Sequence, residues 1–172
     1  DLEILYFSCL DVDSATMEKY SGGRAETLKG YIKDALSGNK EGEDKVRFKY
    51  RSPWYKMVNS SLVKKYGLFF EEVKKGNDMM FSFSVSYLAK TYIITERPVY
   101  CVTYRSDSMT FGIKSIQMYK DSIAGKMKVS AFNRFIDHED WTKPLIYYIL
   151  SDLKYLSFKS QIDYIFMLVR NI

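Results

Sequence analysis

The chain has 172 residues, of which 47% are hydrophobic and 16% aromatic, and this composition excludes an intrinsically disordered protein. Its length fits one domain with a substantial buried core. The net charge of +5 comes from Lys and Arg residues scattered along the chain, which excludes the basic stripe of a nucleic-acid-binding protein and leaves a mild attraction to anionic membranes or diphosphates.

The first part of the chain predicts strands that alternate with a helix. Residues 2–8 form a short apolar run and predict a buried strand, whereas residues 9–23 predict a polar loop. Apolar residues at helical spacing predict a helix over 24–37. Apolar and basic residues alternate over 46–51, and this period predicts a half-buried strand.

Two helices are predicted in the middle of the chain. The first covers residues 60–66, with Asn59 or Ser60 as its N-cap and Gly67 as its stop. The second covers 78–90 and is mostly apolar.

The rest of the chain predicts two strands and then only helices. The strands cover 92–95 and 99–104, and the connection Glu96-Arg97-Pro98 is short enough for them to pair as a hairpin. After Gly112 the apolar spacing is helical throughout. Three helices are predicted, over 116–136, from about 142 to 153 with Pro144 in the first turn, and over 158–169.

One carboxylate, Asp78, lies between Gly76 and the first turn of a predicted apolar helix. Asp is among the preferred N-cap residues, so one interpretation of Asp78 is a helix cap. The other is a general base, because an acid at a helix start that faces a cleft is well placed to remove a proton. The helix dipole favours the charged form of such an acid. The residues alone leave both roles open.

The surroundings of Asp78 contain several short motifs in a fixed order. They are Pro53-Trp54-Tyr55-Lys56, a helix ending at Tyr66-Gly67, the pair Phe69-Phe70, and Asn77-Asp78. This order resembles the acceptor half of family 2 glycosyltransferases with the GT-A fold, and the resemblance covers about residues 1–110. It implies that Asp78 deprotonates the acceptor hydroxyl, which then displaces the nucleotide diphosphate with inversion. The family usually has an acid where this chain has Asn77, which leaves Asp78 as the only match.

The resemblance also implies substrate contacts, and each has a plain structural alternative. Trp54 would stack on a sugar, or it is a core anchor. Lys56 would offset diphosphate charge, or it is a solvated strand residue. Arg105, in the segment YCVTYRSDSMT, would contact a phosphate or the acceptor, or it forms a surface ion pair. We predict Trp54, Lys56, Asn77 and Arg105 as substrate-binding residues.

No metal ligand is predicted in this chain. Asp11-Val12-Asp13 matches the bare D-x-D pattern of GT-A metal sites, but the resemblance places residues 2–8 after that motif, so both acids are assigned to a polar loop. His138, the single histidine, lies in a polar cluster typical of a helix start, without a partner at metal-binding spacing. The resemblance implies a divalent cation, Mg or Mn, only for a full-length enzyme.

The expected fold class is α/β. Residues 1–112 are predicted to form the acceptor-side portion of a GT-A domain with a few short strands, and residues 113–172 a helical C-terminal extension. Because Asp1 opens directly into an apolar run, we expect a piece of a longer protein. The resemblance implies that this piece lacks the nucleotide-binding half and is inactive alone. Cys9 and Cys101 predict buried thiols in a reducing compartment.

The resemblance implies an enzyme of bacterial polysaccharide biosynthesis that moves a sugar from a nucleotide-sugar donor to a saccharide or lipid-linked acceptor. We expect a cytoplasmic location, since no signal peptide or spanning segment is predicted. The resemblance implies a place at the inner face of the membrane. The C-terminal helices would touch the bilayer, or pack on the core or on a second copy of the chain. The alternative function is a non-catalytic module that binds carbohydrate or protein.

Overall fold

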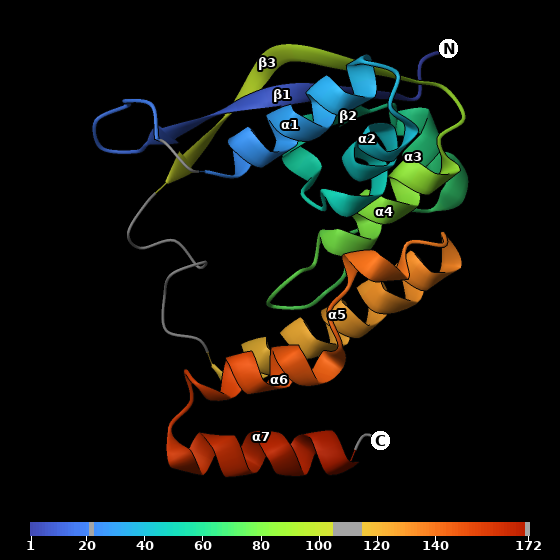
Figure 1. The fold of residues 1–172 in the computed structure, drawn as a ribbon. Coiled ribbons are helices and arrows are strands. Elements are labelled where there is room, and N and C mark those ends of the chain that lie inside the picture. The colour runs from blue at the N-terminus through green and yellow to red at the C-terminus, as the bar shows by residue number, and fades with distance from the viewer. Residues whose placement is uncertain (21–22, 105–114, 171–172) are drawn as a thin grey trace. The chain divides into compact units, whose positions relative to one another are not determined.

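The computed structural model describes residues 1–20, 23–104 and 115–170, apart from the side chains of residues 167 and 170. In these ranges the protein is α/β, with a mixed three-stranded sheet and seven α-helices (Figure 1). The chain divides into two units. Unit 1 comprises 1–71 and 78–112, and unit 2 comprises 72–77 and 113–172.

Unit 1 contains the sheet and its covering helices. Its elements in chain order are β1 (Ile4–Asp13), α1 (Arg24–Leu36), α2 (Lys40–Asp44), the π-helix η1 (Lys45–Lys49), the 3-10 turn η2 (Pro53–Tyr55), β2 (Lys56–Val58), α3 (Ser60–Tyr66), α4 (Met79–Leu88) and β3 (Tyr92–Tyr104). The predictions of α1, α3 and α4 are confirmed. The side chain of Asn59 accepts a hydrogen bond from the Ser61 N–H and caps α3, and Gly67 ends it in the left-handed conformation.

The central strand of the sheet is β1. It pairs antiparallel with β2 and parallel with β3, in the order β2-β1-β3. The pairing with β3 continues as far as Asp13 opposite Tyr104. The predicted strand over 2–8 was therefore too short, and the residues from Cys9 to Asp13 belong to β1 instead of a loop.

The two predicted strands over 92–95 and 99–104 are one strand, β3, so the predicted hairpin is wrong. The prolyl residue Pro98 lies opposite Ser8, where the register of the parallel pairing shifts. In the described sheet β3 is an edge strand, and an edge strand tolerates Pro because one of its sides needs no ladder donor.

The predicted strand over 46–51 is also wrong, because this segment continues α2 as the π-helix η1. Tyr50 N–H donates to the carbonyl oxygen of Lys45, the five-residue spacing of a π-turn. The hydroxyl group of the buried Tyr55 lies 2.8 Å from the carbonyl oxygen of Val46 and also contacts that of Tyr50. These contacts from distant residues override the strand propensity of the segment.

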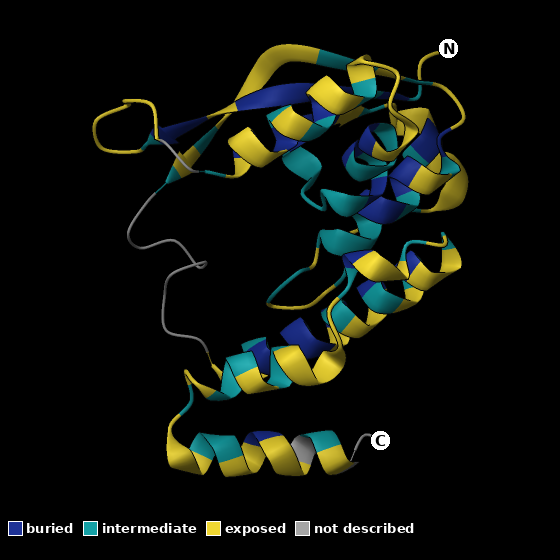
Figure 2. Cartoon of the chain, in the orientation of Figure 1, coloured by how far each residue is buried: buried dark blue, intermediate teal, exposed yellow. Residues whose placement is uncertain are grey.

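The core of unit 1 lies between β1 and the helices, and Figure 2 shows the buried residues along β1. Its fully buried members include Ile4 and Tyr6 of β1, Leu28 and Ile32 of α1, and Val85 of α4. Of the two cysteines, Cys9 is buried as predicted, whereas Cys101 is exposed. Cys101 lies on β3, and that strand is exposed along its second half because it is an edge strand.

Unit 2 is helical in its described residues. It contains α5 (Ile116–Phe135), the 3-10 turn η3 (Glu139–Trp141), α6 (Leu145–Leu153) and α7 (Phe158–Arg170), with Pro144 at the N-cap position of α6. A small core holds Tyr119, Ile123 and Tyr164 together. His138 stacks on Trp141 with ring centres 3.7 Å apart, as expected for a structural residue. No described helix is long and apolar enough to cross a bilayer.

Candidate functional site

A buried lysine links β2 to α4. Lys56 begins β2, is only 7% exposed, and lies over the rings of Tyr55 and Tyr6. Its ammonium group donates to Ser82 Oγ at 2.7 Å, to the Ser82 carbonyl oxygen at 3.1 Å and to Ser86 Oγ at 3.0 Å. An ammonium group has three donors, so these contacts use its hydrogen-bonding capacity within the protein.

The electrostatics of Lys56 are dominated by its burial. Loss of solvation lowers the pKa of Lys56 well below 10.5, and the carboxylate of Asp78 acts in the opposite direction. Asp78, Ser82 and Ser86 are spaced four residues apart, so they share one face of α4. The ammonium group therefore lies along the same helix face that begins with Asp78.

Asp78 occupies the N-cap position of α4 but does not cap it. Its side chain makes no capping hydrogen bond, and its backbone has helical angles instead of the extended ones of a typical cap. Only its carbonyl oxygen accepts, from the Ser82 N–H at 2.9 Å. The interpretation of Asp78 as a side-chain cap of α4 is thus wrong. The half-buried carboxylate accepts no hydrogen bond from the described residues.

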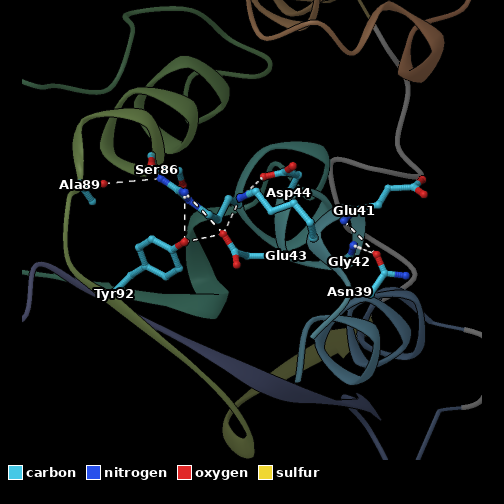
Figure 3. A network of polar contacts seen from close by, with 10 residues as sticks. Asn39, Glu41, Gly42, Glu43, Asp44, Ser86, Ala89 and Tyr92 are labelled. Atoms are coloured by element: carbon cyan, nitrogen blue, oxygen red, sulfur yellow. Dashed lines mark hydrogen bonds and ion pairs between the residues drawn. The ribbon is translucent and has the colours of Figure 1, made fainter. Parts of the chain in front are cut away.

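A second cation holds the other end of α4 (Figure 3). The Arg47 guanidinium donates to the carbonyl oxygens of Ser86 at 2.9 Å and Ala89 at 3.5 Å, and to the Tyr92 hydroxyl at 3.2 Å. Glu43 accepts from the same hydroxyl and lies 3.8 Å from Arg47. Positive charge near carbonyl groups at a helix C-terminus is favourable. Lys56 and Arg47 together fix α4 and so the position of Asp78.

Trp54 packs against the core of unit 1 and is half-buried. Its indole lies edge-on to Tyr50 and parallel to Tyr100, with ring centres 5.6 and 5.9 Å apart. These contacts support the role of an anchor. Stacking on a sugar stays a prediction for Trp54, and any such sugar would meet a ring that already has a protein partner on one side.

Asn77, Arg105 and Lys56 are the other predicted binding residues. Asn77 is exposed. Arg105 lies outside the described residues. Lys56 stays a predicted substrate contact, but the structure directs its ammonium group inward, so a positioning role follows more directly from its geometry.

The acids of the D-x-D pattern are engaged with the backbone. Oδ2 of the buried Asp11 accepts from Ala25 N–H at 2.8 Å in the first turn of α1, and Oδ1 of Asp13 accepts from the N–H groups of Ala15 and Thr16. Among the described residues no group of three or more candidate metal ligands gathers. Both acids belong to the end of β1, so their assignment to a loop is corrected.

Sequence reasoning missed the serines of α4 and the role of Arg47. The signal was present, because Ser82 and Ser86 recur at helical spacing within the apolar run MMFSFSVSYL. Serines on one face of a buried helix need a polar partner, and a lysine or arginine elsewhere in the chain is the simplest candidate.

No family model, no curated protein and no solved structure matches the chain. The chemical argument for the site therefore depends on its own geometry. The site consists of the Asp78 carboxylate, which accepts no hydrogen bond from the part of the chain that the structure describes, and the buried Lys56 ammonium group on the same face of α4.

Proposed function

We propose that the chain is the acceptor-side portion of an inverting glycosyltransferase and that Asp78 is its catalytic base. The observation that carries the proposal is the Asp78 carboxylate, which stands at the start of α4 without a capping hydrogen bond. A carboxylate whose only duty was to cap the helix would accept from the N–H groups of the first turn. The order of motifs around Asp78 supports the same role.

In the proposed reaction, Asp78 accepts the proton of a saccharide or lipid-linked acceptor hydroxyl. The oxygen attacks the anomeric carbon of the donor sugar, and the bond to the nucleotide diphosphate breaks with its electron pair on the leaving phosphate. Lys56 and Arg47 act at a distance, because they hold the helix that carries Asp78. The nucleotide and any divalent cation would be bound by a part of the protein outside this chain, at the inner face of the membrane.

The test uses the full-length protein with Asp78→Asn, which keeps the shape of the side chain and removes its basicity. We expect the rate of sugar transfer to fall by roughly 10²–10⁴-fold, the usual contribution of a general base. The matched control is Asp34→Asn, on an exposed position of α1, which should leave the rate unchanged. Unchanged transfer by Asp78→Asn would overturn the assignment.

A second experiment tests whether the donor side is supplied elsewhere. The 172-residue chain is incubated with nucleotide sugars, and released nucleotide diphosphate is measured. We expect no hydrolysis and no transfer. Turnover by this chain alone would contradict the proposed division of the enzyme.

A non-catalytic carbohydrate-binding module is the alternative function. It is favoured by the parallel pair of Trp54 and Tyr100, since Tyr100 is 48% exposed and presents aromatic surface beside the indole. Calorimetric titration of the chain with oligosaccharides, compared with Trp54→Phe, tests it, because the heat of binding does not depend on the indole as a reporter. Two results together would favour the module over the enzyme. The wild type would bind oligosaccharide saturably and Trp54→Phe would not, and Asp78→Asn would leave the rate of sugar transfer unchanged.

A further inference from the structure

Unit 2 contains a basic pocket that the proposed reaction does not use. The pocket lies between α5 and the segment leading into α6, and its volume is about 230 Å³. All its lining residues belong to the range 126–148. It is therefore formed within one unit and is separate from Asp78 and Lys56.

Three cations line this pocket, namely Lys126, Arg134 and Lys143. The Lys126 ammonium group lies 3.5 Å from Oδ2 of Asp152, which is a long distance for an ion pair. The exposed Arg134 donates a hydrogen bond from Nε to Glu139 Oε1 at 3.0 Å. Its two terminal nitrogens have no partner in the described part of the chain. The Lys143 ammonium lies over the Tyr147 ring, 3.9 Å from its centre. The pocket therefore holds more positive charge than the neighbouring carboxylates engage.

The hydroxyl groups of Thr142 and Tyr148 add neutral hydrogen-bond donors to the lining of the pocket. The Thr142 hydroxyl accepts from Asn133 Nδ2 at 2.6 Å, and the Tyr148 hydroxyl accepts from the Lys143 N–H at 3.4 Å. Each hydroxyl thereby uses an acceptor position and keeps its own proton to donate. Both residues line the pocket, so both protons are available to an acceptor there.

We propose that this pocket binds a phosphate or diphosphate group. A phosphate brings several strong acceptor oxygens, which match the three cations and two hydroxyl groups among the lining residues. The terminal nitrogens of Arg134 suit two phosphate oxygens at once. Met127 and Leu145 also line the pocket and offer apolar contact to any organic group attached to that phosphate.

The phosphate can come from a free diphosphate or from a lipid headgroup, and two probes separate these sources. Inorganic pyrophosphate is titrated into the 172-residue chain by calorimetry. In parallel, the chain is sedimented with phosphatidylcholine vesicles that contain phosphatidic acid, and with phosphatidylcholine alone. Neither measurement depends on sugar transfer, so its result tests the pocket without testing the role of Asp78.

The test variant is Lys143→Ala/Tyr148→Phe, which removes one cation and one hydroxyl from the pocket. The matched control, Lys154→Ala/Tyr155→Phe, makes the same chemical changes at exposed residues of unit 2 outside the pocket lining. Circular dichroism and thermal melting establish that both variants are folded before binding is compared.

We expect the pocket variant to raise the dissociation constant about tenfold or more and the control to change it less than about twofold. Binding of pyrophosphate with this pattern assigns the pocket to a free diphosphate. Binding only of vesicles with phosphatidic acid, with the same pattern, assigns it to a lipid headgroup. Absence of binding to both probes, or equal loss in the two variants, overturns the proposal.

Discussion

Lys56 donates a 2.7 Å hydrogen bond to the hydroxyl of Ser82, and this buried contact joins the start of β2 to the middle of α4. Because Asp78 lies one turn before Ser82 on the same helix face, the contact also fixes where the Asp78 carboxylate stands. Lys56, whose motif predicted a substrate contact, therefore helps to hold α4, the helix that begins with the proposed base Asp78.

The absence of a cap contact at Asp78 predicts a small effect on stability. Asp78→Asn should change the free energy of unfolding by less than about 0.5 kcal/mol at pH 10.5, because no capping hydrogen bond is lost and the attraction to Lys56 is absent once that ammonium group is neutral. Asn59→Ala removes a cap that is present in α3 and should cost about 1 kcal/mol. Urea denaturation of both variants measures the difference, and a larger loss for Asp78→Asn would mean that its side chain does support α4.

Burial of Lys56 predicts a pH-dependent stability. The pKa of Lys56 is lowered in the folded state, so between that value and 10.5 the unfolded chain binds more protons than the folded one. Stability therefore rises with pH through this window and is flat below it. Lys56→Met lacks this titration and should be more stable at pH 7 by about 1 kcal/mol, since its replacement avoids a buried charge.

Urea midpoints measured from pH 7 to about 11.5 check this prediction, because the window closes above the ordinary pKa of 10.5. The wild type should gain stability relative to Lys56→Met as the pH rises, until the difference levels off near 10.5. Parallel curves for the two proteins would show that Lys56 is not desolvated in the native state.

Two glycines of unit 1 should respond in opposite directions to the same substitution. A Cβ at Gly23 would lie 2.3 Å from Oδ2 of the buried Asp11 and would displace the carboxylate from Ala25 N–H. Gly23→Ala should therefore cost about 2 kcal/mol. Gly30→Ala, inside α1 with no atom within 4 Å, should add about 0.5–1 kcal/mol of stability. Thermal melts of both proteins provide the comparison.

The guanidinium of Arg47 should not be replaceable by an ammonium group. Arg47→Lys cannot reach the carbonyl oxygens of α4 and the Tyr92 hydroxyl together, and should lower the free energy of unfolding by about 2 kcal/mol. The same exchange at the exposed Arg134 should cost less than about 0.5 kcal/mol. Equal effects in chemical denaturation would show that the network in Figure 3 does not stabilise α4.

Local signals predicted several elements of this fold. The start of α3 is predictable because the Asn59 side chain can accept a hydrogen bond from the first turn. Its end is predictable because Gly67 adopts positive φ without strain. The position of Asp78 at the start of α4 followed from the apolar run after it. Such features depend on neighbouring residues only, which is why one sequence sufficed.

Other features depend on distant residues and were not predictable. The alternation over 46–51 has the period of a strand, but Tyr55 and the end of α4 hold the segment as a π-helix. Pro98 indicated a break between strands, and only the parallel pairing with β1 shows that the chain continues through it. For the site, the inward direction of Lys56 is set by serines in α4, far along the chain.

The order of the strands has a consequence for synthesis on the ribosome. β1 precedes both of its partners, and the backbone of Glu3 and Thr91, 88 positions apart, must meet before the parallel pair closes. Such long-range pairing slows folding and leaves an apolar strand unprotected while the chain grows. Nascent β1, with its buried residues Ile4, Tyr6 and Phe7, is therefore the segment that a chaperone would have to shield.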